Sequence, residues 1–169
     1  SGLIKSYCIS KVTRVVPGGK ERQDSVYCGI KALDEAASIV VVHDGARPFA
    51  DRSMVRGVID GLRDCDGAVA GVRVKDTIKE TGGQGAGVVV KTLERSALWS
   101  VQTPQVFRAR TILEAHEKAR SEGYYATDDA ALVERYGGRI RIVEGSYRNI
   151  KVTTPDDIYI AEAILKGMH

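Results

Sequence analysis

Residues 38–49, SIVVVHDGARPF, set an apolar, β-branched run directly before an acid, a glycine and an arginine. A short apolar run that ends in turn residues is typical of a strand buried in a sheet. In open α/β sheets, ligands bind outside the carboxyl ends of the strands, which is where Asp44 and Arg47 fall. A carboxylate there can hold Mg²⁺, and a guanidinium can grip a phosphate. Alternatively, Asp44 caps a helix or pairs with Arg47 in a loop, and this stretch alone leaves both interpretations open.

The rest of the chain alternates short apolar runs with segments of helical period. Strands are expected at 11–16, 38–43, 67–74 and 139–145. Helices are expected at 24–36 and 54–62, from Thr111 with Glu114 completing a cap, from Thr127, and over 153–165. The last helix has Thr154 as its cap, Pro155 at its first position and Asp157 completing a capping box. The alternation predicts an α/β fold with a Rossmann-like, mostly parallel sheet and helices on both faces.

One segment, residues 76–95, breaks this alternation. The strand-like runs DTIKE and VVVKTLE flank the glycine-rich TGGQGAG at 81–87, which predicts a two-stranded β-ribbon. An isolated ribbon is only marginally stable in water, so this arm is expected to pack on a second subunit. The glycines do not favour a phosphate loop, because the segment lacks a strand-loop-helix context and the G-x-G-x-x-G spacing.

Composition limits the possible classes of protein. The 169 residues suit one domain, 1–169, of ordinary globular composition, without a signal-peptide pattern or an apolar run that could cross a bilayer. Cys8, Cys28 and Cys65 lack metal-ligand spacing and read as reduced thiols of a soluble cytoplasmic protein. The net charge of +3 suits small anionic ligands but is too diffuse to argue for nucleic acid, so no nucleic-acid partner is expected.

Polar groups recur at the predicted ends of other elements. They are Asp76 and Thr77, residues 102–105 (QTPQ), Thr127 with Asp128, and Lys151. Hydroxyls, a lysine and helix N-termini commonly bind phosphate esters. Alternatively, Thr127 is a plain helix cap and Lys151 a solvated surface charge. Their convergence at one edge of a sheet favours a site for a phosphate ester.

Six stretches in series resemble the 2-C-methyl-D-erythritol 4-phosphate cytidylyltransferases: PGGKERQDSV, VHDGARPF, VKDTIK, LERSALWSVQTPQVF, YATDDAALVE and NIKVTTPDDIYIAEAIL. The resemblance implies transfer of a cytidylyl group from CTP to the phosphate of methylerythritol 4-phosphate, with release of pyrophosphate, in the non-mevalonate isoprenoid pathway. Family members begin with a strand and a glycine-rich A-A-G-x-G-x-R loop, which the 169 residues do not show. Because that loop supplies much of the charge that holds the triphosphate, residues 1–169 alone are expected to transfer no cytidylyl group.

The resemblance also implies roles for individual residues. For the nucleotide and its Mg²⁺, Asp44 would organise the metal or the ribose, and Lys151 would face the α-phosphate. Cytosine would be recognised by the loop residues Gly18, Gly19 and Ser25.

The second substrate would have its own set of side chains. Arg47, Thr77, Thr103 and Thr127 would position methylerythritol phosphate, and Arg95 would reach its phosphate from the β-arm of the other subunit of a homodimer. A general base is not needed, because the attacking phosphate is already an anion.

Two other functions remain open from the sequence. Ribitol 5-phosphate cytidylyltransferases share the fold and several motifs, although LWSVQTPQVF at 98–107 favours the methylerythritol enzyme. A non-catalytic, dimerising remnant is the alternative from another class.

Overall fold

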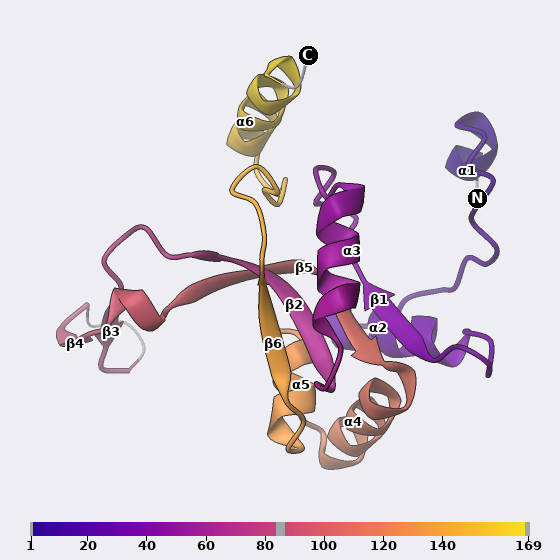
Figure 1. Cartoon of the computed structure of the whole chain (residues 1–169), viewed down its shortest axis with the longest axis horizontal. Coiled ribbons are helices and arrows are strands. Elements are labelled where there is room, and N and C mark those ends of the chain that lie inside the picture. Colours follow the sequence, from indigo (N-terminus) through magenta and orange to yellow (C-terminus); the bar gives the residue numbers. More distant parts are fainter. Residues whose placement is uncertain (1, 84–86, 168–169) are drawn as a thin grey trace.

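A four-stranded sheet lies at the centre of the computed structural model, which describes residues 2–83 and 87–167 (Figure 1). The sheet has the order β1-β5-β2-β6. Its strands are β1 (Ile39–Val42), β2 (Gly67–Arg73), β5 (Trp99–Arg108) and β6 (Ile140–Glu144). Strands β1, β2 and β6 run in one direction, and β5 runs antiparallel between β1 and β2. The predicted α/β fold is therefore confirmed, with one reversed strand inside the sheet.

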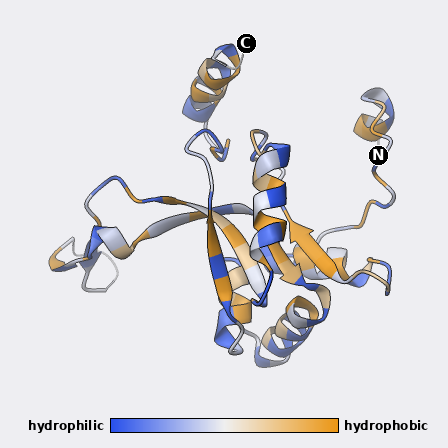
Figure 2. Ribbon diagram, viewed as in Figure 1, coloured by the Kyte–Doolittle hydropathy of each residue, from blue (hydrophilic) through white to orange (hydrophobic). Residues whose placement is uncertain are grey.

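Helices cover both faces of this sheet, as predicted. Helix α3 (Arg52–Gly61) packs on one face, and α2 (Arg22–Lys31), α4 (Ala109–Glu122) and α5 (Asp129–Arg135) pack on the other. Successive residues of a strand point to opposite faces. Accordingly, Ala68 joins the α3 side and Val69 the α4–α5 side, so the strands carry apolar residues on both faces (Figure 2).

Strand β5 was missing from the sequence-based prediction. Residues 102–105 are not a polar cluster at a strand end but lie inside β5, where they are buried. Several of their polar groups have partners: Asn149 Nδ2 donates to the Thr103 carbonyl at 2.9 Å, and Gln105 Nε2 donates to Asp128 Oδ2 at 2.8 Å, whereas Gln105 Oε1 is buried without a partner. Buried polar groups are tolerated when they are hydrogen-bonded in this way. A buried central strand can therefore contain polar residues, and these residues make the strand difficult to predict from the sequence.

The predicted strand at 11–16 was wrong. These residues are exposed and adopt no strand in the described part of the chain, because no neighbouring strand pairs with them. The predicted helix at 24–36 is α2, which begins earlier and ends at Lys31, leaving Leu33 beyond it with 44% of its surface exposed.

Two predicted helix starts were also wrong. Helix α4 begins at Ala109, ahead of Thr111, so Thr111 lies within its first turn and does not cap it. Helix α5 is capped by Asp128, whose side chain accepts a hydrogen bond from the Ala131 backbone N–H at 2.9 Å. Thr127 precedes Asp128 and does not cap the helix. The alternative interpretation of Thr127 as a plain helix cap is therefore wrong.

The β-arm is present as predicted. Strand β3 (Lys79–Thr81) pairs antiparallel with β4 (Val89–Thr92), and the short helix η1 (Arg95–Ala97) follows. Residues 84–86 of the predicted glycine-rich loop lie outside the described residues. The arm extends to the left of the sheet in Figure 1 and exposes Val88, Val89 and Val90.

Two further helices extend away from the sheet (Figure 1). They are α1 (Gly2–Ser6) near the amino end, at the upper right of the view, and α6 (Pro155–Lys166) near the carboxyl end, above the middle of the sheet. The predicted start of α6 is confirmed, because Thr154 and Asp157 form a reciprocal capping box. Within residues 2–83 and 87–167, none of the helices has the length and apolar character that crossing a membrane requires.

Gly67 provides a test of the packing between β2, β5 and β6. A Cβ atom on Gly67 would lie 2.6 Å from Phe107 Cδ1 and 2.7 Å from Ile140 Cδ1. We expect Gly67→Ala to destabilise the fold by about 1–3 kcal/mol, because a packed core yields little to an added methyl group. Thermal unfolding should show a Tm lower by roughly 3–10 °C.

The matched control is Gly57→Ala in α3. A Cβ atom there would meet Val143 Cγ1 at 3.6 Å, an ordinary van der Waals distance. An unchanged Tm for Gly67→Ala, or an equal loss for Gly57→Ala, would contradict the packing described here.

Candidate active site

Three cationic side chains surround the carboxylate of Asp44, just beyond the end of β1. Lys151 Nζ lies 3.1 Å from Asp44 Oδ2, Arg22 Nε lies 3.4 Å from Oδ1, and Arg47 Nε lies 3.9 Å from Oδ2. We call these four residues the Asp44 cluster. It brings together Asp44, Arg47 and Lys151, three of the residues singled out in the sequence, and adds Arg22, which was not.

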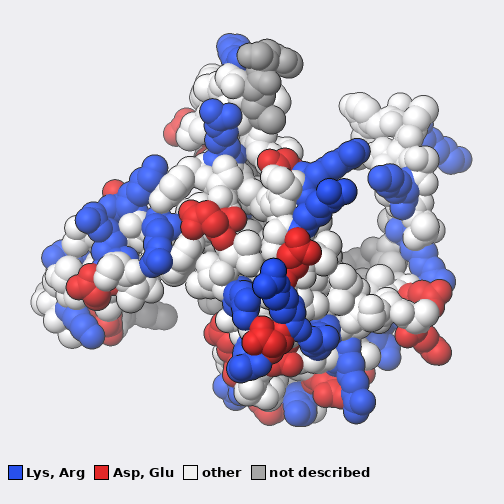
Figure 3. Space-filling model, viewed as in Figure 1, with Lys and Arg blue, Asp and Glu red and all other residues white. Residues whose placement is uncertain are grey.

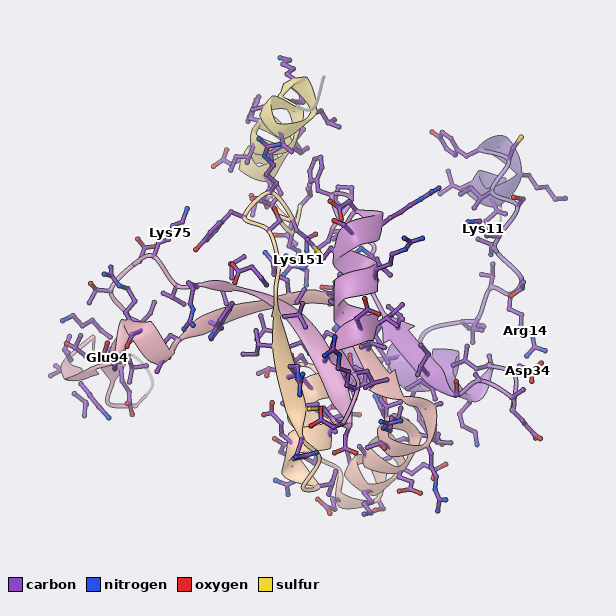
Figure 4. All side chains as sticks on the ribbon, viewed as in Figure 1. Lys11, Arg14, Asp34, Lys75, Glu94 and Lys151 are labelled. Atoms are coloured by element: carbon purple, nitrogen blue, oxygen red, sulfur yellow. The ribbon has the colours of Figure 1, made fainter. Side chains whose placement is uncertain are left out.

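The path of the chain explains how Lys151 reaches the site. After β6 the chain turns back over the sheet, with the Gly145 N–H bonded to the Gly71 carbonyl and the Val152 N–H bonded to the Ala46 carbonyl. Residues 145–152, which we call the return passage, bring Lys151 from the β6 side of the sheet to the β1 side. In Figure 4, Lys151 lies near the middle of the molecule, above the sheet.

The charges of the cluster hold Asp44 ionised. Burial alone would raise the pKa of the Asp44 carboxyl, but the hydrogen bond and charge of Lys151, followed by those of Arg22, lower that pKa below its usual range. Burial lowers the pKa of Arg47, and the charge of Asp44 opposes this change. At neutral pH the cluster therefore holds one negative and three positive charges, a surplus that favours an anionic ligand.

Thr103 and His43 hold the loop that carries Asp44. The Asp44 backbone N–H donates to Thr103 Oγ1 at 3.0 Å, and the same hydroxyl lies 3.0 Å from His43 Nδ1. His43 Nε2 lies 2.9 Å from the Arg47 carbonyl oxygen. Thr103 thus lies at the site, as predicted, and positions the loop in this structure.

Asn149 is a second support that the sequence analysis missed. Its side chain is fully buried, and its backbone carbonyl accepts a hydrogen bond from Arg47 Nη1 at 2.8 Å. Asn149 Nδ2 donates to the Thr103 carbonyl and to Gln102 Oε1. The residue therefore ties the return passage to β5 and orients Arg47. Its position two residues before Lys151 was the only signal in the sequence.

The loop before α2 lies beside the cluster because Arg22 is the first residue of that helix. The Gly19 N–H donates to Ser25 Oγ at 3.1 Å, and Ser25 Oγ donates to the Glu21 carbonyl at 3.1 Å. A Cβ atom on Gly18 would lie 2.7 Å from Ser25 Oγ, and one on Gly19 would collide with the Asp24 side chain. Both glycines thus let the loop pass close to α2, and the predicted base-binding residues Gly18, Gly19 and Ser25 form one compact turn.

Gly19 provides a test of this turn. Because a methyl group must displace the loop from α2, we expect Gly19→Ala in the full-length protein to lower kcat/KM for CTP roughly ten- to a hundredfold. The Tm should change little, since the loop is exposed.

Gly29→Ala in α2 is the control, because a Cβ atom on Gly29 would meet nothing within 4 Å. Alanine also favours the helix over glycine. Unchanged CTP kinetics in Gly19→Ala would show that the turn does not serve the nucleotide.

Thr127 also lies close to the cluster. Together with Lys20, Arg22 and Gln23 it lines a cavity of about 410 Å³ between the start of α2 and the segment before α5. Gln23 fixes this segment, since its Nε2 donates to the Tyr124 carbonyl and its Oε1 accepts from the Ala126 N–H. The structure thus brings Thr127 to the same side of the sheet edge as Arg22.

Thr77 and Arg95 lie elsewhere, at the base of the arm. They line a separate concavity of about 670 Å³ with Arg73 and Glu94, and Arg95 Nη1 donates to the Lys75 carbonyl at 2.8 Å. Figure 4 shows Glu94 on the arm, well away from Lys151. Within one chain, the structure therefore does not bring these two predicted residues to the Asp44 cluster.

The described residues do not form a metal site by themselves. Among residues 2–83 and 87–167, no group of three or more His, Cys, Asp or Glu side chains is placed to hold an ion. In the cluster, Asp44 is the one carboxylate, and both of its oxygens contact cations. Any Mg²⁺ here would need most of its ligands from a substrate, which is how phosphate-bound Mg²⁺ is commonly held.

An α/β sheet with a cationic cluster at one edge suits an enzyme that transfers a nucleotidyl group, and comparison with known proteins bears out this class. A family model described as 2-C-methyl-D-erythritol 4-phosphate cytidylyltransferase matches residues 3–167. The chain belongs to that family.

Individual relatives agree with the family match. The enzyme of this name from Geobacillus thermodenitrificans is 51% identical over 163 residues, which cover 96% of this chain and 70% of the relative. The solved 4-diphosphocytidyl-2C-methyl-D-erythritol synthase of Anaerococcus prevotii is 33% identical with a TM-score of 0.89, covering 98% of this chain and 76% of that chain. The solved cytidylyltransferase of Thermus thermophilus is 36% identical with a TM-score of 0.79, covering 89% and 72%.

Proposed function

We propose that the Asp44 cluster carries out the reaction of this family, the transfer of a cytidylyl group from CTP to 2-C-methyl-D-erythritol 4-phosphate. The observation that carries the proposal is the set of three cations around one carboxylate at the edge of the sheet. Two phosphate-bearing anions can react only where their charge is offset. The relatives named above all carry the methylerythritol name, which disfavours the ribitol phosphate and non-catalytic alternatives.

In the proposed reaction, a phosphate oxygen of methylerythritol phosphate attacks the α-phosphorus of CTP. A P–O bond forms to the attacking oxygen as the bond to pyrophosphate breaks. Lys151 would face the α-phosphate and stabilise the additional charge of the transition state. Arg47, Thr103 and Thr127 would position the attacking phosphate, and the turn of Gly18, Gly19 and Ser25 would contact the cytosine.

For the cofactor, we propose that Mg²⁺ arrives with the triphosphate and takes at most one ligand, Asp44, from the residues of this cluster. When bound, the ion would neutralise part of the phosphate charge. Asp44 would keep Lys151 and Arg22 at the edge of the nucleotide site, and this role does not depend on the ion.

We further propose that Thr77 and Arg95 serve the site of a second subunit in a homodimer. The arm projects from the sheet, exposes apolar residues and carries Lys and Arg side chains, which Figure 3 shows as blue patches at the left. A long arm of this kind suits an isologous contact, in which each copy contributes the same surface to the other. Arg95 would then contact the sugar phosphate in the partner's site.

The test of the proposed function is the reaction itself. The full-length protein with CTP, Mg²⁺ and methylerythritol 4-phosphate is expected to release pyrophosphate and to form a phosphodiester-linked product, which ³¹P NMR resolves from both substrates. Ribitol 5-phosphate in place of the methylerythritol substrate should give a kcat/KM at least tenfold lower. Absence of the product, or preference for ribitol 5-phosphate, would contradict the proposal.

A further inference from the structure

A buried aspartate outside the Asp44 cluster also contacts Arg22. Asp129, the first residue of α5, is fully buried, and its Oδ2 lies 2.8 Å from Arg22 Nη1. A different nitrogen of the same guanidinium, Nε, lies 3.4 Å from Asp44 Oδ1. Arg22 therefore contacts two carboxylates from two elements through two different nitrogens of its planar guanidinium, a rigid fork of donors that the single nitrogen of a lysine lacks.

His116 fixes the other oxygen of Asp129. His116 Nε2 lies 3.1 Å from Asp129 Oδ1, and the two side chains are 0% and 1% exposed. The His116 ring belongs to α4 and stacks with Tyr27 of α2 at a centroid separation of 6.1 Å. The Asp129 carboxylate is thereby held on one side by α4 and on the other by α2, so it has little freedom to rotate.

The surroundings of Asp129 favour a role in orientation over one in stability. The next residues of α5, Ala130, Leu132 and Val133, belong to the apolar core. Ion pairs in such places commonly add no more stability than well-packed apolar side chains would. A charge at this position instead gives Arg22 a fixed second anchor, and this anchor holds the guanidinium at a defined distance from Asp44.

We propose that Asp129, fixed by His116, is a positioning residue that acts through Arg22 on the nucleotide site. This inference rests on the proposed function of the Asp44 cluster. The contacts join α5, which follows Thr127, to α2, which follows the turn of Gly18 and Gly19. They end at the Asp44 carboxylate. Asp129 would thus set the relative placement of the nucleotide side and the sugar-phosphate side of the site without touching either substrate.

A double-mutant cycle tests this inference. We expect Asp129→Asn to lower kcat/KM of the full-length enzyme roughly tenfold or more, because small displacements in a site have large kinetic effects. In an Arg22→Gln background, the same substitution should change kcat/KM less than twofold, since the group through which it acts is already gone. A purely structural role would lower kcat/KM by the same factor in both backgrounds.

Two further measurements keep the outcome clear. The folded fraction of each variant is measured by circular dichroism, and the rates are expressed per folded protein, so that loss of stability does not count as loss of function. Glu114→Gln is the control, because Glu114 forms an exposed pair with Arg110 on the surface of α4 and should leave kcat/KM unchanged. Equal losses in both backgrounds, or wild-type kinetics for Asp129→Asn, would overturn the inference. An inactive wild-type enzyme would instead contradict the proposed function.

Discussion

Asp44→Asn in the full-length enzyme is expected to lower kcat about a hundredfold or more, which is the scale of loss when one preorganised group that stabilises a transition state is removed. Asparagine keeps the size of the side chain but not its charge. Arg22, Arg47 and Lys151 would then repel one another without the carboxylate that gathers them. The cations at the α-phosphate should lose their alignment even though the fold remains.

The control for Asp44→Asn removes the same charge a few residues away. Asp51 caps α3, where its Oδ1 accepts from the Met54 N–H at 2.8 Å, and asparagine caps a helix as well as aspartate does. Asp51→Asn should keep wild-type kcat and a nearly unchanged Tm. If Asp44→Asn retains more than half of the wild-type kcat, Asp44 is a loop residue that forms ion pairs, as the alternative interpretation of the sequence holds.

Arg95→Ala in the full-length enzyme is expected to be nearly inactive by itself and to complement Asp44→Asn when the two proteins exchange subunits. If Arg95 acts in the partner's site, a heterodimer has one site with both residues intact and one site with neither. Random assembly of an equal mixture makes half of the dimers heterodimers, so about a quarter of wild-type activity should return.

A second mixture provides the control for complementation. Asp44→Asn combined with Lys151→Gln should recover no activity, because both residues belong to the same chain's cluster, with Lys151 Nζ 3.1 Å from Asp44 Oδ2. Exchange itself is verified by mass spectrometry of differently labelled subunits. If verified exchange restores nothing in the Arg95 mixture, Arg95 does not serve the partner's site.

Local sequence signals predicted the parts of the fold that depend on local chemistry. The apolar run before Asp44 predicted β1, the Thr154–Asp157 capping box predicted the start of α6, and the glycine-flanked runs predicted the β3–β4 arm. Each of these signals lies within a few residues of the structure that it predicts, so no knowledge of the tertiary fold was needed.

The features that were missed depend on distant partners. Strand β5 carries Gln102, Thr103 and Gln105, which a buried strand accepts because Asn149 and Asp128 bond to them from far along the chain. The prediction of a strand at 11–16 was wrong for the opposite reason. Its β-branched residues favour a strand, but within the described residues no strand pairs with them.

The candidate site was likewise only partly visible in the sequence. Asp44 stood out because it follows an apolar run, and Lys151 because it follows RNI at the end of a predicted element, whereas Arg22 looked like an ordinary charge in the first turn of a helix. Its importance comes from a guanidinium that reaches Asp44 and Asp129, residues 22 and 107 positions further along the chain. Contacts over such separations leave no periodic pattern for sequence analysis to find.

CTP is expected to bind the full-length enzyme at the Asp44 cluster, and amide hydrogen exchange with and without the nucleotide tests this most directly. Saturating CTP with Mg²⁺ should slow amide exchange in the peptides that cover residues 17–25, 43–47 and 149–152. These peptides contain the turn before α2, the Asp44 loop and part of the return passage, which would all contact the ligand. Residues 155–166 of α6 should exchange as before. Slower exchange confined to α6 or to the arm, with no change around Asp44, Arg22 and Lys151, would contradict the account.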